Sequence, residues 1–189
     1  MSFTETPVKL LLAVVVIIIA AAAGMYLGGK LSESSGQSSA NQLDIFTHLT
    51  LGPGIDFPDI QVTNDRYQPE LTQSILNENG TVILFMDHQC PPCQDVAVFW
   101  QQLINNGDIA SEQVIGICFE DAAHIHNIRN RYQVTFPIYA DEEYTFLDNY
   151  GVDAFPLILI VGRSGVINYI ETDSNKKIGK SELKKSLQS

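Results

Sequence analysis

The spacing of hydrophobic residues predicts a sheet built from buried strands that alternate with helices. Three short, continuous apolar runs are bounded by turn residues, which is typical of fully buried strands. Two shorter stretches and a hairpin partner after Gly165 predict further strands. The predicted strands are residues 61–63, 82–86, 113–119, 136–139, 157–161 and 166–170. Helical spacing and end signals predict helices at residues 69–77, 90–104, 121–132, 142–150 and 176–187.

The order of these elements indicates the fold class. Strand–helix alternation in the middle of the chain implies a parallel core, and the final hairpin adds antiparallel strands. We therefore expect an α/β domain with a mixed central sheet and helices on both faces. The domain is expected to span residues 55–189, after a Ser/Gly/Gln-rich linker and lead-in at residues 31–54.

An apolar segment precedes the linker. Residues 10–27 carry no charge, and a helix of that length would measure about 27 Å, close to the hydrocarbon core of a bilayer. We expect residues 1–30 to be an uncleaved membrane anchor. The alternative is a signal peptide, with an apolar core at residues 10–19 and a cleavage site among Ala20–Ala23. Either arrangement places the domain on the extracytoplasmic (periplasmic) side of the cell membrane.

The overall charge restricts the partners. The chain has a formal net charge of −11, which opposes binding to nucleic acid and to anionic lipid headgroups. We therefore expect no nucleic-acid partner.

The chemistry-bearing motif is Cys90-Pro-Pro-Cys93, which joins an apolar strand to an amphipathic helix. A thiol at a helix N-terminus is stabilised as the thiolate by the helix dipole and by free backbone N–H groups. The two cysteines are close enough to cycle between dithiol and disulfide. The third cysteine, Cys118, lies within a predicted strand and is expected to be a small buried hydrophobic residue; the alternative is a third redox thiol.

Two blocks of sequence resemble the TlpA/ResA-type membrane-anchored thiol–disulfide oxidoreductases, which have the thioredoxin fold. One is the strand with its Cys-Pro-Pro-Cys motif, and the other runs from Phe136 through Phe155-Pro156 to Gly165. The resemblance implies a TlpA-like insertion between the blocks and a cis Pro156 facing the disulfide. It also implies that Phe155 and Pro156 contact an extended substrate segment. It implies no cofactor and no metal site.

The same resemblance implies a function. Similar proteins reduce disulfides in exported proteins, for example in cytochrome c maturation or metal-site assembly, and receive electrons from a membrane donor. We therefore expect a reductase whose Cys90 attacks a target disulfide and whose Cys93 resolves the mixed disulfide.

The chain departs from the family pattern around the cysteines. Gln89 replaces a common Trp, while Leu84 and Val96 occupy positions where related proteins carry acids that move protons. The candidates to substitute for those acids are Asp87, His88 and Asp95. His88 would lower the pKa of Cys90 if it lay beside the sulfur; otherwise it is a solvent-facing loop residue.

Three other functions remain open. A copper-site chaperone would use Cys90, Cys93 and His88, although the cysteine spacing and Pro156 oppose it. A peroxiredoxin would need a Thr where Asp87 stands. A non-enzymatic thioredoxin-like subunit of a membrane complex is the third alternative. The remaining histidines, His48, His124 and His126, are expected at the surface.

Overall fold

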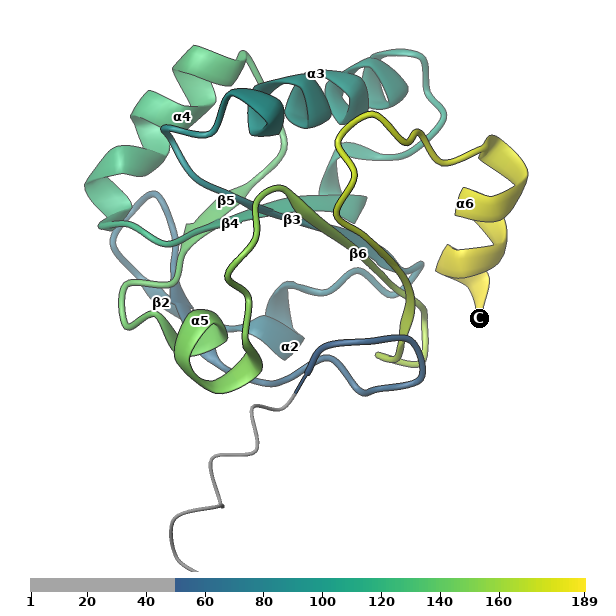
Figure 1. Ribbon diagram of the computed structural model, residues 1–189, viewed down its shortest axis with the longest axis horizontal. Coiled ribbons are helices and arrows are strands. Elements are labelled where there is room, and N and C mark those ends of the chain that lie inside the picture. The colour runs from purple at the N-terminus through teal and green to yellow at the C-terminus, as the bar shows by residue number, and fades with distance from the viewer. Residues whose placement is uncertain (1–49) are drawn as a thin grey trace, which may run out of the picture. The chain divides into compact units, whose positions relative to one another are not determined.

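The computed structural model describes residues 50–189, which form a seven-stranded sheet in the order β2-β1-β5-β4-β3-β6-β7 (Figure 1). Strand β4 lies at the centre, and its neighbour β3 is parallel to β4 and antiparallel to β6. The expected mixed sheet is therefore confirmed. The strands are β1 (Gln61–Thr63), β2 (Pro69–Leu71), β3 (Thr81–Met86), β4 (Val114–Cys118), β5 (Ile138–Ala140), β6 (Leu157–Val161) and β7 (Ile167–Glu171).

The three continuous apolar runs form the three most buried strands. Every residue of β3, β4 and β6 is buried, because helices or loops cover both faces of the sheet there. One core lies beneath α3 and α4 and includes Trp100. The second lies on the opposite face and includes Phe57 and Phe146.

Helices lie on both faces of the sheet, as Figure 1 shows, with α3 and α4 on one face and α2 and α5 on the other. Helix α6 lies beside β6 and β7. Short 3-10 turns at Ser111–Gln113 and Ala122–His124 precede β4 and α4. The helices are α2 (Thr72–Ile75), α3 (Pro91–Asn105), α4 (Ile125–Tyr132), α5 (Thr145–Tyr150) and α6 (Lys180–Gln188).

The predicted helix at residues 69–77 is wrong in its first turn. Residues Pro69–Leu71 instead form strand β2, which pairs antiparallel with β1, and only Thr72–Ile75 are helical. A turn stabilised by Asn64, whose side chain accepts from the Arg66 and Gln68 N–H groups, brings the two strands together. Strand β1 is therefore internal, and β2 takes the edge position, which tolerates a proline.

Helix α5 begins three residues later than expected. The carboxylate of Asp141 accepts hydrogen bonds from the N–H groups of Thr145 (3.0 Å) and Phe146 (2.8 Å), so the helix starts at Thr145. Asp141 is fully buried, and burial raises the pKa of its carboxyl. This carboxylate satisfies N–H groups that have no partner within the helix.

The predicted anchor and most of the predicted linker lie outside the described residues. Within residues 50–189, no helix has the length and hydrophobicity needed to cross a bilayer.

Candidate redox site

The two cysteines of the motif form a disulfide at the start of helix α3, on the same face of the sheet as α4. The Cα atoms of Cys90 and Cys93 lie 5.2 Å apart. Cys90 precedes the first turn of the helix and is partly exposed, whereas Cys93 is only 1% exposed. An incoming sulfur can therefore approach Cys90 more readily than Cys93.

The local sequence determines which backbone groups face the Cys90 sulfur. Pro91 and Pro92 occupy the first helical positions and carry no N–H. The first N–H group of the helix is therefore that of Cys93, which donates to Sγ of Cys90 at 3.2 Å. This donor and the helix dipole would stabilise a negative charge on that sulfur.

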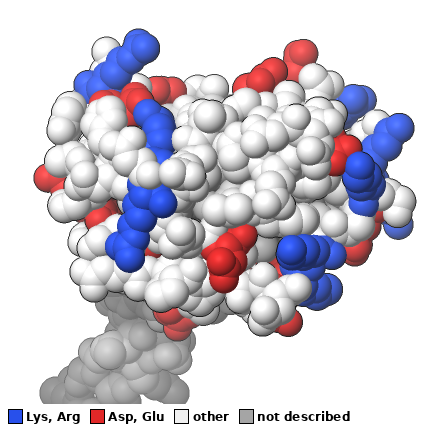
Figure 2. All heavy atoms as spheres, turned by 90° about the horizontal axis from the view of Figure 1, so that it is seen from above, with Lys and Arg blue, Asp and Glu red and all other residues white. Residues whose placement is uncertain are grey.

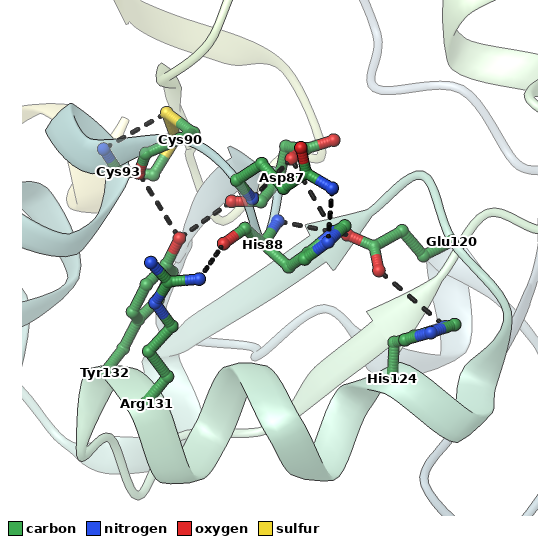
Figure 3. A network of polar contacts seen from close by, with 9 residues as sticks. Asp87, His88, Cys90, Cys93, Glu120, His124, Arg131 and Tyr132 are labelled. Carbon is green, nitrogen blue, oxygen red and sulfur yellow. Dashed lines mark hydrogen bonds and ion pairs between the residues drawn. A yellow bond between two sulfur atoms is a disulfide. The ribbon is translucent and has the colours of Figure 1, made fainter.

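Helix α4 holds the loop that leads into the motif. The hydroxyl of Tyr132 donates to the carbonyl of Asp87 (2.7 Å) and to that of Cys90 (3.3 Å). The guanidinium of Arg131 donates to the carbonyl of His88 (2.8 Å) (Figure 3). Burial raises the pKa of the Tyr132 hydroxyl, so it remains a donor at neutral pH. Sequence reasoning missed both roles, because only contact between distant segments reveals them.

His88 extends toward Glu120 rather than toward the disulfide (Figure 3). Its Nδ1 lies 2.5 Å from Oε1 of Glu120, and its backbone N–H donates to the same oxygen at 3.0 Å. Glu120 follows β4 in the sequence and was not among the predicted site residues. No local pattern of residues indicates this contact, since 32 residues separate Glu120 from His88.

The other two candidate acids occupy different positions. Oδ1 of Asp87 accepts the N–H of Gln89 at 2.6 Å, which fixes the turn before Cys90. Asp95 is exposed on helix α3, whereas Leu84 and Val96 are buried in the same core as Cys93. The described residues thus bring Asp87 and His88 together but leave Asp95 on the solvent side of the helix.

The predicted cis bond between Phe155 and Pro156 is present. Phe155 is half-buried and packs against the same core as Cys90 and Cys93. Its ring centre lies 5.2 Å from that of Phe119. Pro156 is buried and immediately precedes strand β6.

Cys118 is completely buried in β4, as predicted. Burial, with a smaller contribution from the negative charge of Glu120, raises the pKa of its thiol to about 12. Cys118 therefore carries almost no thiolate at neutral pH, which opposes the alternative of a third redox thiol.

A family model supplies independent information. The model of the AhpC/TSA family matches residues 53–170, which include the disulfide and the Phe155–Pro156 segment. The chain belongs to the AhpC/TSA family. Comparison with curated proteins gives no match.

Solved structures similar to this AhpC/TSA-family chain share its thioredoxin-like fold. A secreted disulfide oxidoreductase from Mycobacterium tuberculosis has 18% identity and a TM-score of 0.53, over 68% of this chain and 93% of that one. The thioredoxin domain of a thiol-disulfide oxidoreductase from Bacteroides vulgatus has 15% identity and a TM-score of 0.56, over 72% of this chain and 95% of that one. The peroxidoxin BcpB from Mycobacterium tuberculosis has 13% identity and a TM-score of 0.55, over 65% of this chain and 86% of that one.

Family membership and the Cys90–Cys93 disulfide together support the predicted class of enzyme, a thiol–disulfide oxidoreductase. The similar structures show only that the fold is shared, because their sequence identities to this chain are low.

Proposed function

We propose that this AhpC/TSA-family chain is a TlpA/ResA-type enzyme that reduces disulfides in exported proteins. The observation that carries the proposal is the disulfide at the N-terminus of α3, with Cys90 accessible and Cys93 buried. A pair with this asymmetry has a distinct attacking sulfur and a distinct resolving sulfur.

The reaction follows from that asymmetry. In the reduced protein, the thiolate of Cys90 attacks one sulfur of a target disulfide, forming a mixed disulfide and releasing the other target sulfur as a thiolate. Cys93 then loses its proton and attacks Cys90, which releases the second target sulfur. The target gains two electrons and two protons, and the enzyme is left as the Cys90–Cys93 disulfide. A membrane protein that carries a dithiol would return it to the reduced state.

The mechanism requires a group that takes the proton from Cys93. The deprotonation of Cys93 takes place beside the apolar side chains Leu84 and Val96. We assign proton transfer to Asp87, which belongs to the loop that ends at Cys90, whereas the ring of His88 faces Glu120 and its proton-transfer role stays a prediction from the sequence. Asp95, on the exposed side of α3, stays a prediction from the sequence.

The surface around helix α3 suits a protein substrate. Asp95 is the only charged residue in the helix, and Val98 is exposed although it is hydrophobic. The middle of the face that carries α3 and α4 is largely uncharged, with Lys and Arg side chains to either side (Figure 2). We propose that an extended substrate segment lies across this surface and contacts Phe155 and Pro156.

The location and the physiological target form part of the same proposal. The apolar residues 10–27 support an N-terminal anchor with the domain on the extracytoplasmic side. Exported proteins that need reduced cysteines, as in cytochrome c maturation or metal-site assembly, are the proposed substrates.

The proposal is tested by the reduction potential of the full-length protein, equilibrated in dithiothreitol buffers. We expect a potential below about −200 mV, in the direction of thioredoxin. A value near about −120 mV would mark an oxidant and reverse the proposed direction. If no reversible couple formed, the non-enzymatic subunit would be the better explanation.

Matched variants test the division of labour between the cysteines. The reduced Cys93→Ser protein should form a stable mixed disulfide with an aromatic disulfide reagent, because Cys90 attacks and no thiol resolves it. Cys118→Ser should behave as the wild type. Equal trapping by Cys90→Ser would contradict the assignment of Cys90 as the attacking thiol.

A further inference from the structure

Three metal-ligating side chains meet beside the redox motif. Asp87, His88 and Glu120 each present a ligand atom, and these atoms all lie within 4.8 Å of one another. Asp87 and His88 follow strand β3, and Glu120 follows β4. The two strands are parallel neighbours, so the segments after their carboxyl ends meet at one edge of the sheet.

One oxygen of this cluster is buried without a hydrogen bond. The side chain of Glu120 is only 10% exposed, and its Oε1 already accepts the backbone N–H of His88 and contacts the imidazole. Its Oε2 is buried and has no hydrogen-bond partner. The nearest cationic candidate is Nδ1 of His124, at 3.7 Å. A buried carboxylate oxygen without a partner is costly unless a cation compensates it.

The second nitrogen of the His88 ring is also held. Its Nε2 lies 2.8 Å from the side-chain amide nitrogen of Gln89, which donates to the ring. If Nδ1 coordinated an ion, Nε2 would carry the proton, and a half-turn of the amide would present the Gln89 oxygen to accept it. Imidazoles that bind metals usually have such a partner on the other nitrogen, which orients the ring. The ring of His124 stacks on that of His88, with centres 5.9 Å apart.

The cluster is open to solvent on one side. The side chains of His88 and Asp87 are 36% and 35% exposed, so an ion could enter without unfolding the loop. Figure 3 shows Asp87 and Glu120 on either side of the His88 ring, with His124 below Glu120.

We propose that Asp87, His88 and Glu120 bind a divalent transition-metal ion. One imidazole and two carboxylates are a donor set that suits Zn²⁺ and similar ions. The ion would replace the proton between Nδ1 of His88 and Glu120, and that proton would pass to solvent. The sequence alone led us to expect no metal site, because it does not show that Glu120 lies beside His88.

The proposed site differs from the copper chaperone considered earlier, because neither cysteine is a ligand. It can therefore be tested with the disulfide intact, when no thiolate of the motif can bind metal. Failure of this test leaves the proposed redox function untouched.

The experiment is calorimetric titration of the oxidised, full-length protein with Zn²⁺ alone. We expect one ion per chain. His88→Ala and Glu120→Gln should each weaken binding at least ~10-fold, since even an outer partner of a metal ligand is worth that much. His126→Ala is the matched control, because His126 also lies near a carboxylate, that of Asp65, and its loss should change nothing.

Two results would overturn the proposal: no stoichiometric binding by the wild type, or unchanged affinity in both site variants. Circular dichroism would establish that the variants are folded. A second measurement needs no variant, since Zn²⁺ should shift the imidazole NMR signals of His88. A shift confined to His126 or His48 would place the ion elsewhere and also overturn the proposal.

Discussion

Replacing Tyr132 with Phe should destabilise the protein, because it removes the hydroxyl that links helix α4 to the loop before the disulfide. The side chain is 2% exposed, and Phe can fill its space. The hydroxyl donates to the carbonyls of Asp87 and Cys90, at 2.7 and 3.3 Å. Because the hydroxyl has a single proton, the two acceptors share it, and the expected effect is the loss of one shared hydrogen bond with little change in packing.

The magnitude depends on whether those carbonyls keep another partner. The carbonyl of Asp87 also accepts the N–H of Cys90, and the carbonyl of Cys90 also accepts the N–H of Cys93. Neither oxygen is left without a hydrogen bond, so the full penalty for an unpaired buried group does not apply. We therefore expect the free energy of unfolding to fall by about 1 kcal/mol, the usual net value of one good hydrogen bond.

Urea unfolding of the oxidised, full-length protein measures this change. Trp100 is the only tryptophan, lies in helix α3 and is 1% exposed, so its fluorescence reports on the unfolding of the domain. Tyr67→Phe is the matched control, because Tyr67 is 62% exposed and should contribute almost nothing. If Tyr132→Phe were as stable as the wild type, the hydroxyl would not hold the loop and the reasoning would be refuted.

Two further predictions concern buried groups. Because the Cys118 thiol has its pKa raised from 9.0 to about 12, the folded state disfavours its thiolate. The contribution of the neutral Cys118 thiol to the free energy of unfolding should be complete below pH 9 and be lost as the pH rises toward 12. In urea unfolding over this pH range, the free energy of unfolding of Cys118→Ala should decline less steeply than that of the wild type. Equally steep declines would contradict the raised pKa of Cys118. Asp141→Ala should lower the free energy of unfolding by about 2 kcal/mol, because it leaves the first N–H groups of α5 without their acceptor. Asp148→Ala, an exposed change in the same helix, is its control; equal losses would disprove the capping role.

Local sequence was sufficient for several features of the fold. The apolar runs that became β3, β4 and β6 needed no knowledge of their partners, because continuous hydrophobicity over five or six residues requires burial on both faces. The burial of Cys118 followed from its place in one of these runs. The cis Phe155–Pro156 bond was identified through a resemblance that rests on residues adjacent in the sequence.

Contacts between distant segments decided the rest. Residues 69–71 have a helix-compatible sequence, yet they form β2 because the turn at Asn64 brings them beside β1. This outcome shows tertiary pairing overriding a weak local preference.

The redox site divides in the same way. The sequence by itself determined the Cys-Pro-Pro-Cys motif and its position at a strand-to-helix junction, because all its residues are neighbours in the chain. Only the tertiary structure decided that Glu120 contacts the imidazole of His88, 32 residues away in the sequence. It also decided that the hydroxyl of Tyr132 donates to the carbonyl of Asp87, 45 residues away. The physical reason is that hydrogen bonds and ion pairs depend on distances of a few ångströms. Packing of β3, β4 and α4 sets those distances, and no local pattern of residues encodes them.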